Sequence, residues 1–299
     1  MPELPDVTIY VERLSAYVVG EELRGLDLLS PFLLRSVDPP ATELVGGRVT
    51  SVQRLGKRIV LGFDRDLFAV LHLMIAGRLR WRDAGAKSPG KTALAGWHFE
   101  RGTLWLTEAS AKKRASLHVV RGDAAVQEFS RGGLEVMEAT PEQFRAALLR
   151  ENRTLKRALT DPRLLSGIGN AYSDEILHAA RLSPVRLTQR LDDAEIERLL
   201  ASIRSTLQHW TDRFRAEVGD GFPEKVTAFR EGMAVHGRYR QPCPDCGAPV
   251  QRIRYASNEC NYCAQCQNAG RLLADRGLSQ LMRKDWPKTL EELEERRRG

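Results

Sequence analysis

The sequence lacks several features that would assign it to other classes of protein. No apolar run approaches the length of about 20 residues that a membrane-spanning helix needs. The opening residues, Met1-Pro-Glu-Leu-Pro5, do not form a secretory signal, and the chain shows no internal repeat. Only five cysteines are present among 299 residues. With no export signal, and with cysteines spaced as metal ligands, we expect a cytoplasmic protein.

The charge balance is uneven. Lys and Arg total 46 against 39 Asp and Glu, which gives a formal net charge of +7 and a pI of about 9.3. Such an excess favours a polyanionic partner without identifying it. The hydrophobic content of 42% is ordinary for a globular protein, and the length suffices for two domains and an appendage.

Four of the five cysteines form two Cys-x-x-Cys pairs near the end of the chain. Cys243-Pro-Asp-Cys246 is separated by sixteen residues from Cys263-Ala-Gln-Cys266. Each pair bends the backbone so that both thiolates reach one ion, and the residues between the pairs fold back as a β-hairpin. The pattern predicts one structural zinc ion held by four thiolates. A disulfide pair is the main alternative, and a reducing compartment disfavours it.

Two questions accompany this predicted zinc finger. Cys260-Asn-Tyr-Cys263 is also a Cys-x-x-Cys, so Cys260 and Cys263 could replace the second pair and leave Cys266 free. We prefer Cys263 and Cys266 because the wider spacing leaves a longer hairpin arm, with Cys260 as a small buried residue. The arm carries Arg252 and Arg254, which predict either a phosphate contact or a solvated basic surface.

The first 131 residues predict one helix followed by short strands. Apolar residues recur at helical spacing from Val7 to Val18, and Asp6 can cap this helix. Apolar runs separated by Gly or Asp then predict strands at residues 48–55, 59–63 and 67–73, and residues 97–101 and 103–107 flank Gly102 like a hairpin. We expect a β-sandwich or barrel with the N-terminal helix packed on it.

From residue 132 the pattern becomes helical. Helical spacing is present at residues 141–151, 155–160, 172–181 and 194–217. The turn Ser166-Gly-Ile-Gly-Asn170 precedes one of these segments, and its glycines would let the backbone approach a phosphate. From these residues alone, a plain turn is the better explanation. The last thirty or so residues predict a docked helical tail, with a capping box that begins at Thr289. Five apolar residues of this tail could form one face: Leu272, Leu273, Leu278, Leu281 and Met282.

Several of these motifs occur together in one known family. Met1-Pro2-Glu3-Leu4-Pro5 resembles the start of the formamidopyrimidine-DNA glycosylase and endonuclease VIII (Fpg/Nei) family, and the resemblance extends over most of the chain. Gly56-Lys57 falls at the family's β-hairpin lysine, and Lys156 at its phosphate-binding lysine. Residues 167–175 are similar to its helix–two-turn–helix signature, and the cysteines lie where its zinc finger lies.

The resemblance implies an α+β multidomain fold with DNA bound in a cleft between two domains. It places an N-terminal catalytic β-sandwich with a leading helix at residues 1–131 and a helix–two-turn–helix DNA-binding domain at 132–232. A zinc finger with a β-hairpin follows at 233–268, and a helical C-terminal extension at 269–299.

The resemblance also implies covalent chemistry at the N-terminus. Once the initiator methionine is removed, the secondary amine of Pro2 can attack the sugar C1′ and form an iminium. Glu3 can relay protons to and from the sugar, and Lys57 completes the catalytic set. Because a base inside a duplex is out of reach, the nucleotide must flip into the cleft. Lys156, Asn170 and the finger arginines would hold the DNA backbone through its phosphates.

The chain departs from the family where the flipped nucleotide is gripped. Asn258 stands in place of an arginine that binds the phosphate of that nucleotide, and Asn lacks the charge and the forked donor geometry. Either Arg252 or Arg254 substitutes from the same hairpin, or the grip on the nucleotide is weaker. Asp6 also stands where the family usually has Glu.

A second departure concerns the side chains that fill the gap left by the flipped base. In the first wedge loop, residues 72–77, Met74 and Ile75 are the candidates for insertion between bases. In the second, Arg114 aligns with the family's arginine and Ala115 with its phenylalanine. We therefore expect the lyase step to survive and the lesion spectrum to differ from that of the 8-oxoguanine enzyme.

These observations predict a bifunctional DNA glycosylase and AP lyase of base excision repair. It would flip and excise a damaged, oxidised base through an N-terminal proline Schiff base and cleave the strand by β- and δ-elimination. The alternatives are an AP lyase with little base excision and a non-catalytic damaged-DNA-binding protein, which would need neither Pro2 nor Glu3. The expected partners are one structural Zn²⁺ and double-stranded DNA with a damaged base or abasic site. We expect a monomer that is cytoplasmic and associated with the nucleoid.

Overall fold

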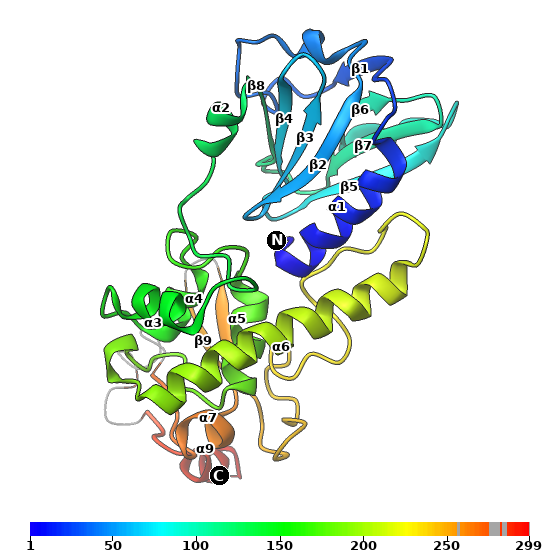
Figure 1. Cartoon of the computed structure of the whole chain (residues 1–299). Helices are drawn as coiled ribbons and strands as arrows, with labels where there is room; N and C mark the ends of the chain where they lie inside the picture. The colour runs from blue at the N-terminus through cyan, green and yellow to red at the C-terminus, as the bar shows by residue number, and fades with distance from the viewer. Residues whose placement is uncertain (256–257, 275–281, 283–285, 299) are drawn as a thin grey trace. The chain divides into compact units, whose positions relative to one another are not determined.

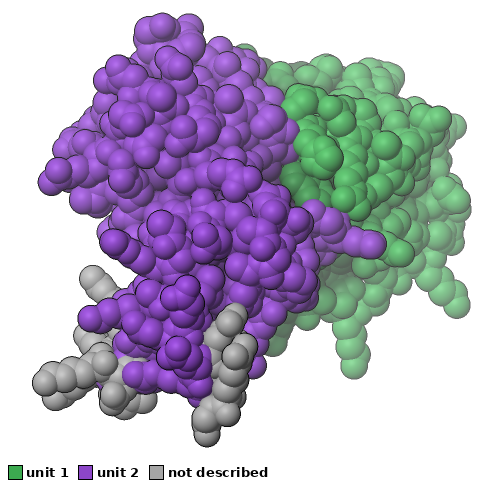
Figure 2. Space-filling view, turned by 90° about the horizontal axis from the view of Figure 1, so that it is seen from below, with its two compact units in different colours: residues 1–131, 208–228 green, residues 132–207, 229–299 purple. Residues whose placement is uncertain are grey.

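The computed structural model describes residues 1–255, 258–274, 282 and 286–298 (Figure 1). By its internal contacts the chain divides into two compact units, each discontinuous in sequence (Figure 2). Unit 1 comprises residues 1–131 and 208–228, and unit 2 comprises residues 132–207 and 229–299. The four contiguous domains expected from the sequence stay a prediction.

Unit 1 is built on two four-stranded antiparallel sheets. The first has the order β1-β6-β7-β5, with β1 at Gly25–Leu28, β6 at Ala93–His98, β7 at Gly102–Glu108 and β5 at Gly77–Asp83. The second has the order β2-β3-β4-β8, with β2 at Val49–Leu55, β3 at Arg58–Phe63, β4 at Leu67–His72 and β8 at Ser116–Arg121. A short helix, α2 (Asp123–Gln127), follows β8.

The strands bury alternate side chains, as the period of a strand requires. In β5, Leu79 and Trp81 are buried, while Arg78, Arg80 and Arg82, which alternate with them, are half-buried on the other face. A single cluster of buried apolar residues takes members from both sheets. The predicted β-sandwich is therefore confirmed, although β1, β5 and β8 were not among the predicted strands.

Helix α1 (Leu4–Val18) packs on the core of this sandwich. Its buried side chains recur at helical spacing and include Val7, Tyr10, Leu14 and Val18. Glu3 is the N-cap: its carboxylate accepts the Asp6 N–H, and the Asp6 carboxylate accepts the Glu3 N–H at 2.9 Å. The prediction that Asp6 caps the helix is wrong, because Pro5 is tolerated in the first turn and the helix begins earlier.

The segment that follows helix α6 (Asp193–Val218) is fastened to β5. Glu224 accepts hydrogen bonds from Arg80 and Arg82, each at 3.1 Å. Nε of Arg78 donates to the backbone carbonyl of Val226 at 2.6 Å. These contacts explain why residues 208–228 group with unit 1, although α6 begins in unit 2.

Unit 2 is mostly helical up to the hairpin. Its helices are α3 (Pro141–Leu149), α4 (Leu155–Thr160), α5 (Asn170–Ala179) and the first part of α6. Thr140 caps α3: its hydroxyl accepts the Gln143 N–H at 3.2 Å, and the Gln143 side chain accepts the Thr140 N–H at 2.9 Å. Residues 171–178 of α5 are all buried. The four predicted helical segments are confirmed, with ends that differ by a few residues.

The region of the cysteines forms the predicted hairpin. β9 (Gln251–Arg254) pairs in antiparallel fashion with β10 (Glu259–Tyr262), and α7 (Ala264–Asn268) follows. In the tail, α9 (Leu290–Arg298) begins as predicted after Thr289, whose hydroxyl accepts the Glu292 N–H at 3.3 Å. Two leucines of the expected apolar face, Leu278 and Leu281, lie outside the described residues. No helix in the described parts of the chain combines the length and apolar character needed to cross a membrane.

The burial of α1 gives a first test of this packing. Leu14 is fully buried in the core of unit 1, so Leu14→Ala should lower the free energy of unfolding by about 2–5 kcal/mol, as measured by chemical denaturation. Val19, just beyond the same helix, is 44% exposed. Val19→Ala should therefore change the stability by no more than about 0.5 kcal/mol. Equal effects of the two substitutions would contradict the described core.

Candidate functional site

The N-terminal residues of unit 1 are buried beside positive charge. Pro2 is buried, and Glu3 is 2% exposed. Burial lowers the pKa of the Met1 amino group below its ordinary value of 8.0; the Glu3 carboxylate opposes this shift, and the charges of Arg78 and Lys57 add to it. An amine with a lowered pKa is unprotonated, and hence nucleophilic, over more of the neutral pH range. The environment of the N-terminus thus suits a nucleophilic amine.

A tight turn carries Lys57. Gly56 and Lys57 are the two turn residues between β2 and β3, and Gly56 has a φ of 61°, which favours glycine. Next to the turn, Arg58 of β3 pairs with His72 of β4. Burial first, and then the charges of Arg58 and Lys57, lower the pKa of His72 to about 4. His72 is therefore neutral at pH 7, and the turn contributes the positive charge.

The first wedge loop is compact and presents one apolar side chain. The Gly77 N–H donates to the Leu73 carbonyl at 2.9 Å, and a Cβ on Gly77 would lie 2.3 Å from that oxygen, so only glycine fits. Met74 has a φ of 53°, in the left-handed region, and its side chain is half-buried. Ile75 is 52% exposed. Of the two predicted wedge residues, Ile75 is the one directed to solvent.

The second wedge loop, residues 109–115, is held by a buried carboxylate. Oε2 of Glu108 accepts the N–H groups of Arg114 and Ala115, at 2.9 and 3.1 Å. The Arg114 side chain is exposed, whereas Ala115 belongs to the core of unit 1. Ala115 therefore has no means of filling a gap in DNA as the aligned phenylalanine would. The sequence analysis did not identify Glu108. The one feature that could have indicated it is its position as an acidic residue at the end of an apolar strand.

In unit 2 the turn before α5 is built on a buried ion pair. Nζ of Lys156, on α4, lies 2.5 Å from Oδ1 of Asp174 and donates at 2.8 Å to both the Ser173 hydroxyl and the Asn170 carbonyl. Oδ2 of Asp174 lies 2.8 Å from Nδ1 of His236. Lys156 is only 8% exposed. Its ammonium holds the first turn of α5 in place, and its predicted phosphate contact stays a prediction.

Other side chains of α5 join this turn to the hairpin. Nδ2 of Asn170 donates to the backbone carbonyl of Glu259 at 2.9 Å, which connects α5 to β10. The Glu175 carboxylate accepts the N–H groups of residues 234, 235 and 236 at 2.7, 2.9 and 2.8 Å. The glycine turn and the hairpin are thus parts of one hydrogen-bonded assembly. Sequence reasoning missed both Glu175 and His236 as organising residues.

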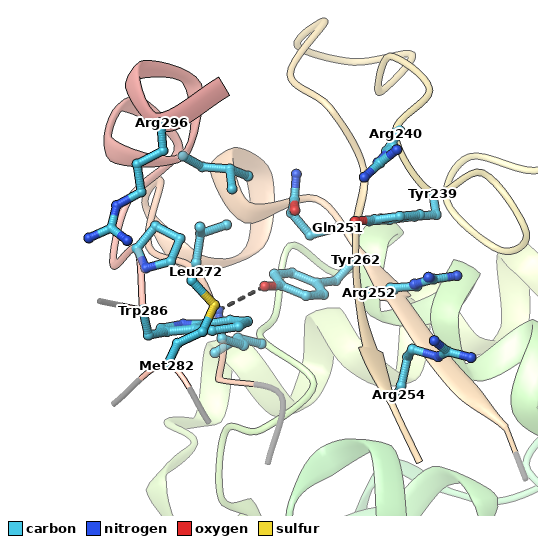
Figure 3. A pocket seen from close by; sticks show the side chains of 13 residues that line it. Tyr239, Arg240, Gln251, Arg252, Arg254, Tyr262, Leu272, Met282, Trp286 and Arg296 are labelled. Atoms are coloured by element: carbon cyan, nitrogen blue, oxygen red, sulfur yellow. Dashed lines mark hydrogen bonds between the residues drawn. The ribbon is translucent and has the colours of Figure 1, made fainter. Parts of the chain in front are cut away.

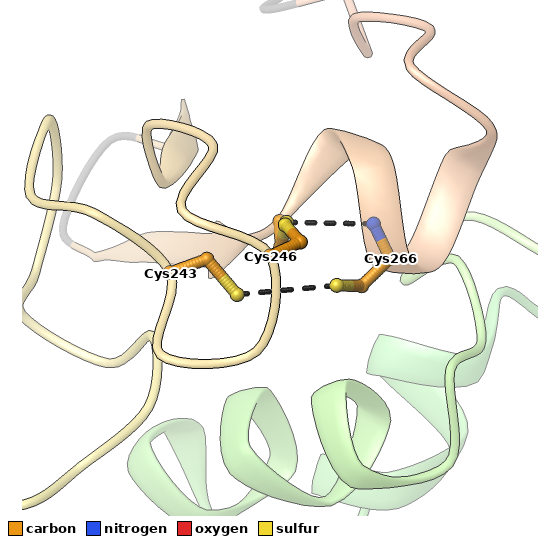
Figure 4. A group of neighbouring side chains, drawn as sticks. Cys243, Cys246 and Cys266 are labelled. Carbon is orange, nitrogen blue, oxygen red and sulfur yellow. Dashed lines mark hydrogen bonds between the residues drawn. The ribbon is translucent and has the colours of Figure 1, made fainter.

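The four paired cysteines meet at one point. The Sγ atoms of Cys243, Cys246, Cys263 and Cys266 all lie within 4.8 Å of one another. Figure 4 shows Cys243 and Cys246 on the loop before the hairpin and Cys266 on the short helix that follows it. Cys260 lies outside this cluster, and burial raises the pKa of its thiol. Four thiolates at this separation can hold a metal ion, and such a donor set suits zinc.

A histidine adds a second layer to the cysteine cluster. Nε2 of His178, on α5, lies 3.2 Å from Sγ of Cys243. An imidazole N–H directed at a metal-bound thiolate stabilises its negative charge and orients it. The sequence offers no signal for this contact, because the two residues are 65 positions apart.

The hairpin arginines differ in their surroundings. Arg252 is paired with Glu259 at 3.1 Å, and its guanidinium lies 4.1 Å from the centre of the Tyr239 ring. Arg254, at the end of β9, is exposed, as is Asn258. The negative charge of Glu259, which would repel a phosphate, is offset by this ion pair. Of the two hairpin arginines, Arg254 is therefore more accessible to a binding partner than Arg252.

Comparison with known proteins agrees with this arrangement. The family model of the formamidopyrimidine-DNA glycosylase N-terminal domain matches residues 1–115, and that of the formamidopyrimidine-DNA glycosylase H2TH domain matches residues 135–213. A formamidopyrimidine-DNA glycosylase of Desulforamulus reducens is 31% identical over 280 residues, which cover 90% of this chain and 100% of the relative.

Solved structures show the same likeness. The MutM (Fpg) protein of Thermus thermophilus is 30% identical and has a TM-score of 0.75, over 89% of this chain and 98% of that chain. The Lactococcus lactis Fpg in complex with DNA that contains an oxidized pyrimidine is 25% identical, with a TM-score of 0.78 over 89% of this chain and 100% of that chain. The chain therefore belongs to the formamidopyrimidine-DNA glycosylase (Fpg/Nei) family, as the resemblance of its motifs predicts.

Proposed function

We propose that this protein is a bifunctional DNA glycosylase and AP lyase of base excision repair, with Pro2 as the nucleophile and Glu3 as the acid and base. The observation that carries the proposal is the burial of Pro2 and Glu3 at the start of α1, where the charges of Arg78 and Lys57 are close enough to act on the amino terminus. Membership in a family of DNA glycosylases supports it, as does the Lactococcus relative bound to DNA with an oxidized base. The expected cytoplasmic, nucleoid-associated location and monomeric state belong to the same proposal.

The chemistry would begin after removal of Met1. The Pro2 nitrogen forms a bond to the sugar C1′ while the bond from C1′ to the base breaks, and the base leaves with a proton. Glu3 protonates the ring oxygen, the C1′–O4′ bond opens, and an iminium between Pro2 and C1′ results. Because Glu3 also accepts the Asp6 N–H, its carboxylate is held at the start of α1, one residue from the nucleophile.

Strand cleavage would follow from the same iminium. The iminium withdraws electrons and so acidifies the sugar protons next to it. Loss of one proton expels the 3′ phosphate by β-elimination, and loss of a second expels the 5′ phosphate by δ-elimination. Water then hydrolyses the iminium and frees Pro2. The positive charges of Lys57 and Arg78 would attract the phosphates on both sides of this sugar.

The remaining predicted residues would hold and bend the DNA. Arg254 and the turn that Lys156 and Asn170 order would bind phosphates, which position the duplex without reading its sequence. Ile75, exposed on its compact loop, would fill the gap left by the flipped base, with Met74 behind it. Arg114, on the second wedge loop, would help to fill the same gap. Asn258 and Arg252 complete the hairpin surface, with Arg252 already paired to Glu259.

The cysteine cluster would hold one structural zinc ion. When bound, zinc supplies a rigid cross-link between the loop before the hairpin and the helix after it, and no step of the sugar chemistry. Cys243, Cys246, Cys263 and Cys266 would be its ligands, with Nε2 of His178 3.2 Å from Sγ of Cys243.

Borohydride trapping tests the nucleophile. On DNA with one abasic site, borohydride should reduce the iminium and leave a covalent protein–DNA adduct, which Pro2→Gly should weaken strongly. Glu3→Gln should slow base excision by about 100-fold or more, the contribution of a positioned acid or base. Glu22→Gln, at an exposed position of unit 1, is the matched control. Absence of an adduct from processed, zinc-loaded protein that still binds DNA would instead favour a non-catalytic DNA-binding protein.

Metal analysis tests the zinc site. The wild type should contain one zinc per chain, because the four Sγ atoms lie within 4.8 Å of one another. Cys243→Ser should lose the metal and bind DNA more weakly, since the hairpin would no longer be held. Cys260→Ser changes the thiol outside the cluster and should keep a full complement of zinc. Loss of zinc from Cys260→Ser, with zinc retained by Cys266→Ser, would reverse this ligand assignment.

The lesion spectrum gives a separate test. We expect 8-oxoguanine opposite C to be excised at least about 10-fold more slowly than an abasic site is cleaved, a difference of ~1.4 kcal/mol in activation free energy. The reason is that Ala115 is buried and Asn258 carries no charge. Asn258→Arg should raise the excision rate and leave abasic-site cleavage unchanged. Equal rates of the two reactions in the wild type would refute the proposed difference.

A further inference from the structure

The hairpin and the C-terminal tail of unit 2 enclose a cavity that the proposed chemistry does not use. Its volume is about 350 Å³, within the range of small-ligand and side-chain pockets. One side is formed by β9, by β10 and by the segment around Tyr239. The other side is formed by tail residues 272–273 and 286–287 and by α9 (Figure 3).

Hydrogen bonds hold the walls of this cavity in place. The Leu272 N–H donates to the Lys288 carbonyl at 2.7 Å, which ties two segments of the tail together. The Leu273 N–H donates to the Tyr262 hydroxyl at 2.8 Å and so fastens the tail to β10. Both leucines pack on the buried cluster that contains Ile253 and Tyr262. The cavity is therefore a built part of the fold.

The cavity is strongly positive. Four arginines line it, from the hairpin side and from α9, and none of the described lining residues is acidic: Arg240, Arg252, Arg254 and Arg296. Figure 3 shows Arg252 and Arg254 on β9 and Arg296 on the helix of the tail. One carboxylate, that of Glu259, pairs with Arg252 at 3.1 Å. Several guanidinium groups around one cavity favour an anionic ligand.

The floor of the cavity is apolar. It is lined by Leu272, Leu273, Trp286, Pro287 and Leu293. The indole N–H of Trp286 is enclosed, and it meets no hydrogen-bond acceptor among the residues that the structure describes. The N–H is thus closed off from the cavity, and Trp286 contributes its apolar ring to the floor. The cavity thus suits a ligand with both an apolar group and negative charge.

We propose that this cavity binds an acidic peptide segment of a partner protein. One large apolar side chain of the segment occupies the floor between Trp286 and Leu293, and flanking carboxylates pair with the arginines. Carboxylates match the forked donor geometry of a guanidinium, which gives such pairs their orientation. The cavity shares Arg254 with the proposed DNA contact, but none of its lining residues takes part in the proposed sugar chemistry, whose residues belong to unit 1.

Two of the three aromatic rings that line the cavity, Tyr239 and Tyr262, offer no open face to a nucleobase, and the third, Trp286, lies among aliphatic side chains of the floor. A nucleobase binds without sequence preference by stacking on an open aromatic face. The Tyr239 ring already carries Arg252 and Arg240, at 4.1 and 5.2 Å from its centre. Tyr262 is 1% exposed, so neither of its faces is open. The largely aliphatic floor instead suits an apolar side chain.

Fluorescence anisotropy with full-length, zinc-loaded protein tests the proposal. The probe is a fluorescein-labelled peptide in which one phenylalanine is flanked by aspartates. Trp286→Ala and Arg296→Glu should each weaken its binding at least ~10-fold, as expected for anchors of a small interface. Arg190→Glu makes the same charge change on an exposed arginine of unit 2 outside the cavity, and should leave binding within about 2-fold of the wild type. Circular dichroism and zinc content verify that the variants fold.

Three results would overturn the proposal. The first is no binding of the peptide by the wild type, and the second is equal binding by the wild type, Trp286→Ala and Arg296→Glu. The third is displacement of the peptide by a mononucleotide or a single-stranded oligonucleotide that itself loses affinity in the same variants, which would make the cavity a nucleotide site. Trp286→Ala should still be trapped on abasic-site DNA by borohydride at the wild-type rate. A change in peptide binding without a change in trapping therefore concerns the cavity and not the proposed catalysis.

Discussion

Unit 2 depends on two adjacent carboxylates buried on α5. A charge removed from water is stable only when partners surround it, and Asp174 and Glu175 have partners on every side. Lys156 and His236 engage the first, and three consecutive backbone N–H groups engage the second. These partners come from α4 and from the segment that leads into the cysteine cluster. The two acids therefore determine where the glycine turn and the hairpin lie relative to each other.

At the N-terminus of unit 1, single residues serve both the fold and the proposed chemistry. Glu3 is the N-cap of α1 and also the proposed acid and base, so the group that would move protons is held by the helix it begins. Arg78 serves twice as well: its guanidinium donates to the carbonyls of Ile75 and Val226, and its charge lowers the pKa of the amino terminus. One arginine thus links the first wedge loop, the segment after α6 and the amino terminus.

The hairpin would serve two ligands. Arg254 and Asn258 lie at its exposed end, where a phosphate contact is proposed, while Arg252 faces the cavity that the tail closes. Because Arg254 lines the cavity too, a bound acidic peptide and a DNA phosphate would compete for it. An acidic partner on this surface would then weaken the grip of the hairpin on DNA, which offers a simple route to coupling between partner binding and repair.

Local pattern was enough to predict the helices from 141 to 218, three strands, the hairpin and the four clustered cysteines. Each of these depends on spacing within a few residues, which the sequence by itself determined. The tertiary structure alone decided that Ala115 enters the core, that Lys156 is buried against Asp174, and that the tail forms a cavity with β9. The physical reason is distance along the chain: Asn170 meets a carbonyl 89 residues away, and Asp174 a histidine 62 residues away. No local period encodes such partners, because they are selected by the packing of whole elements.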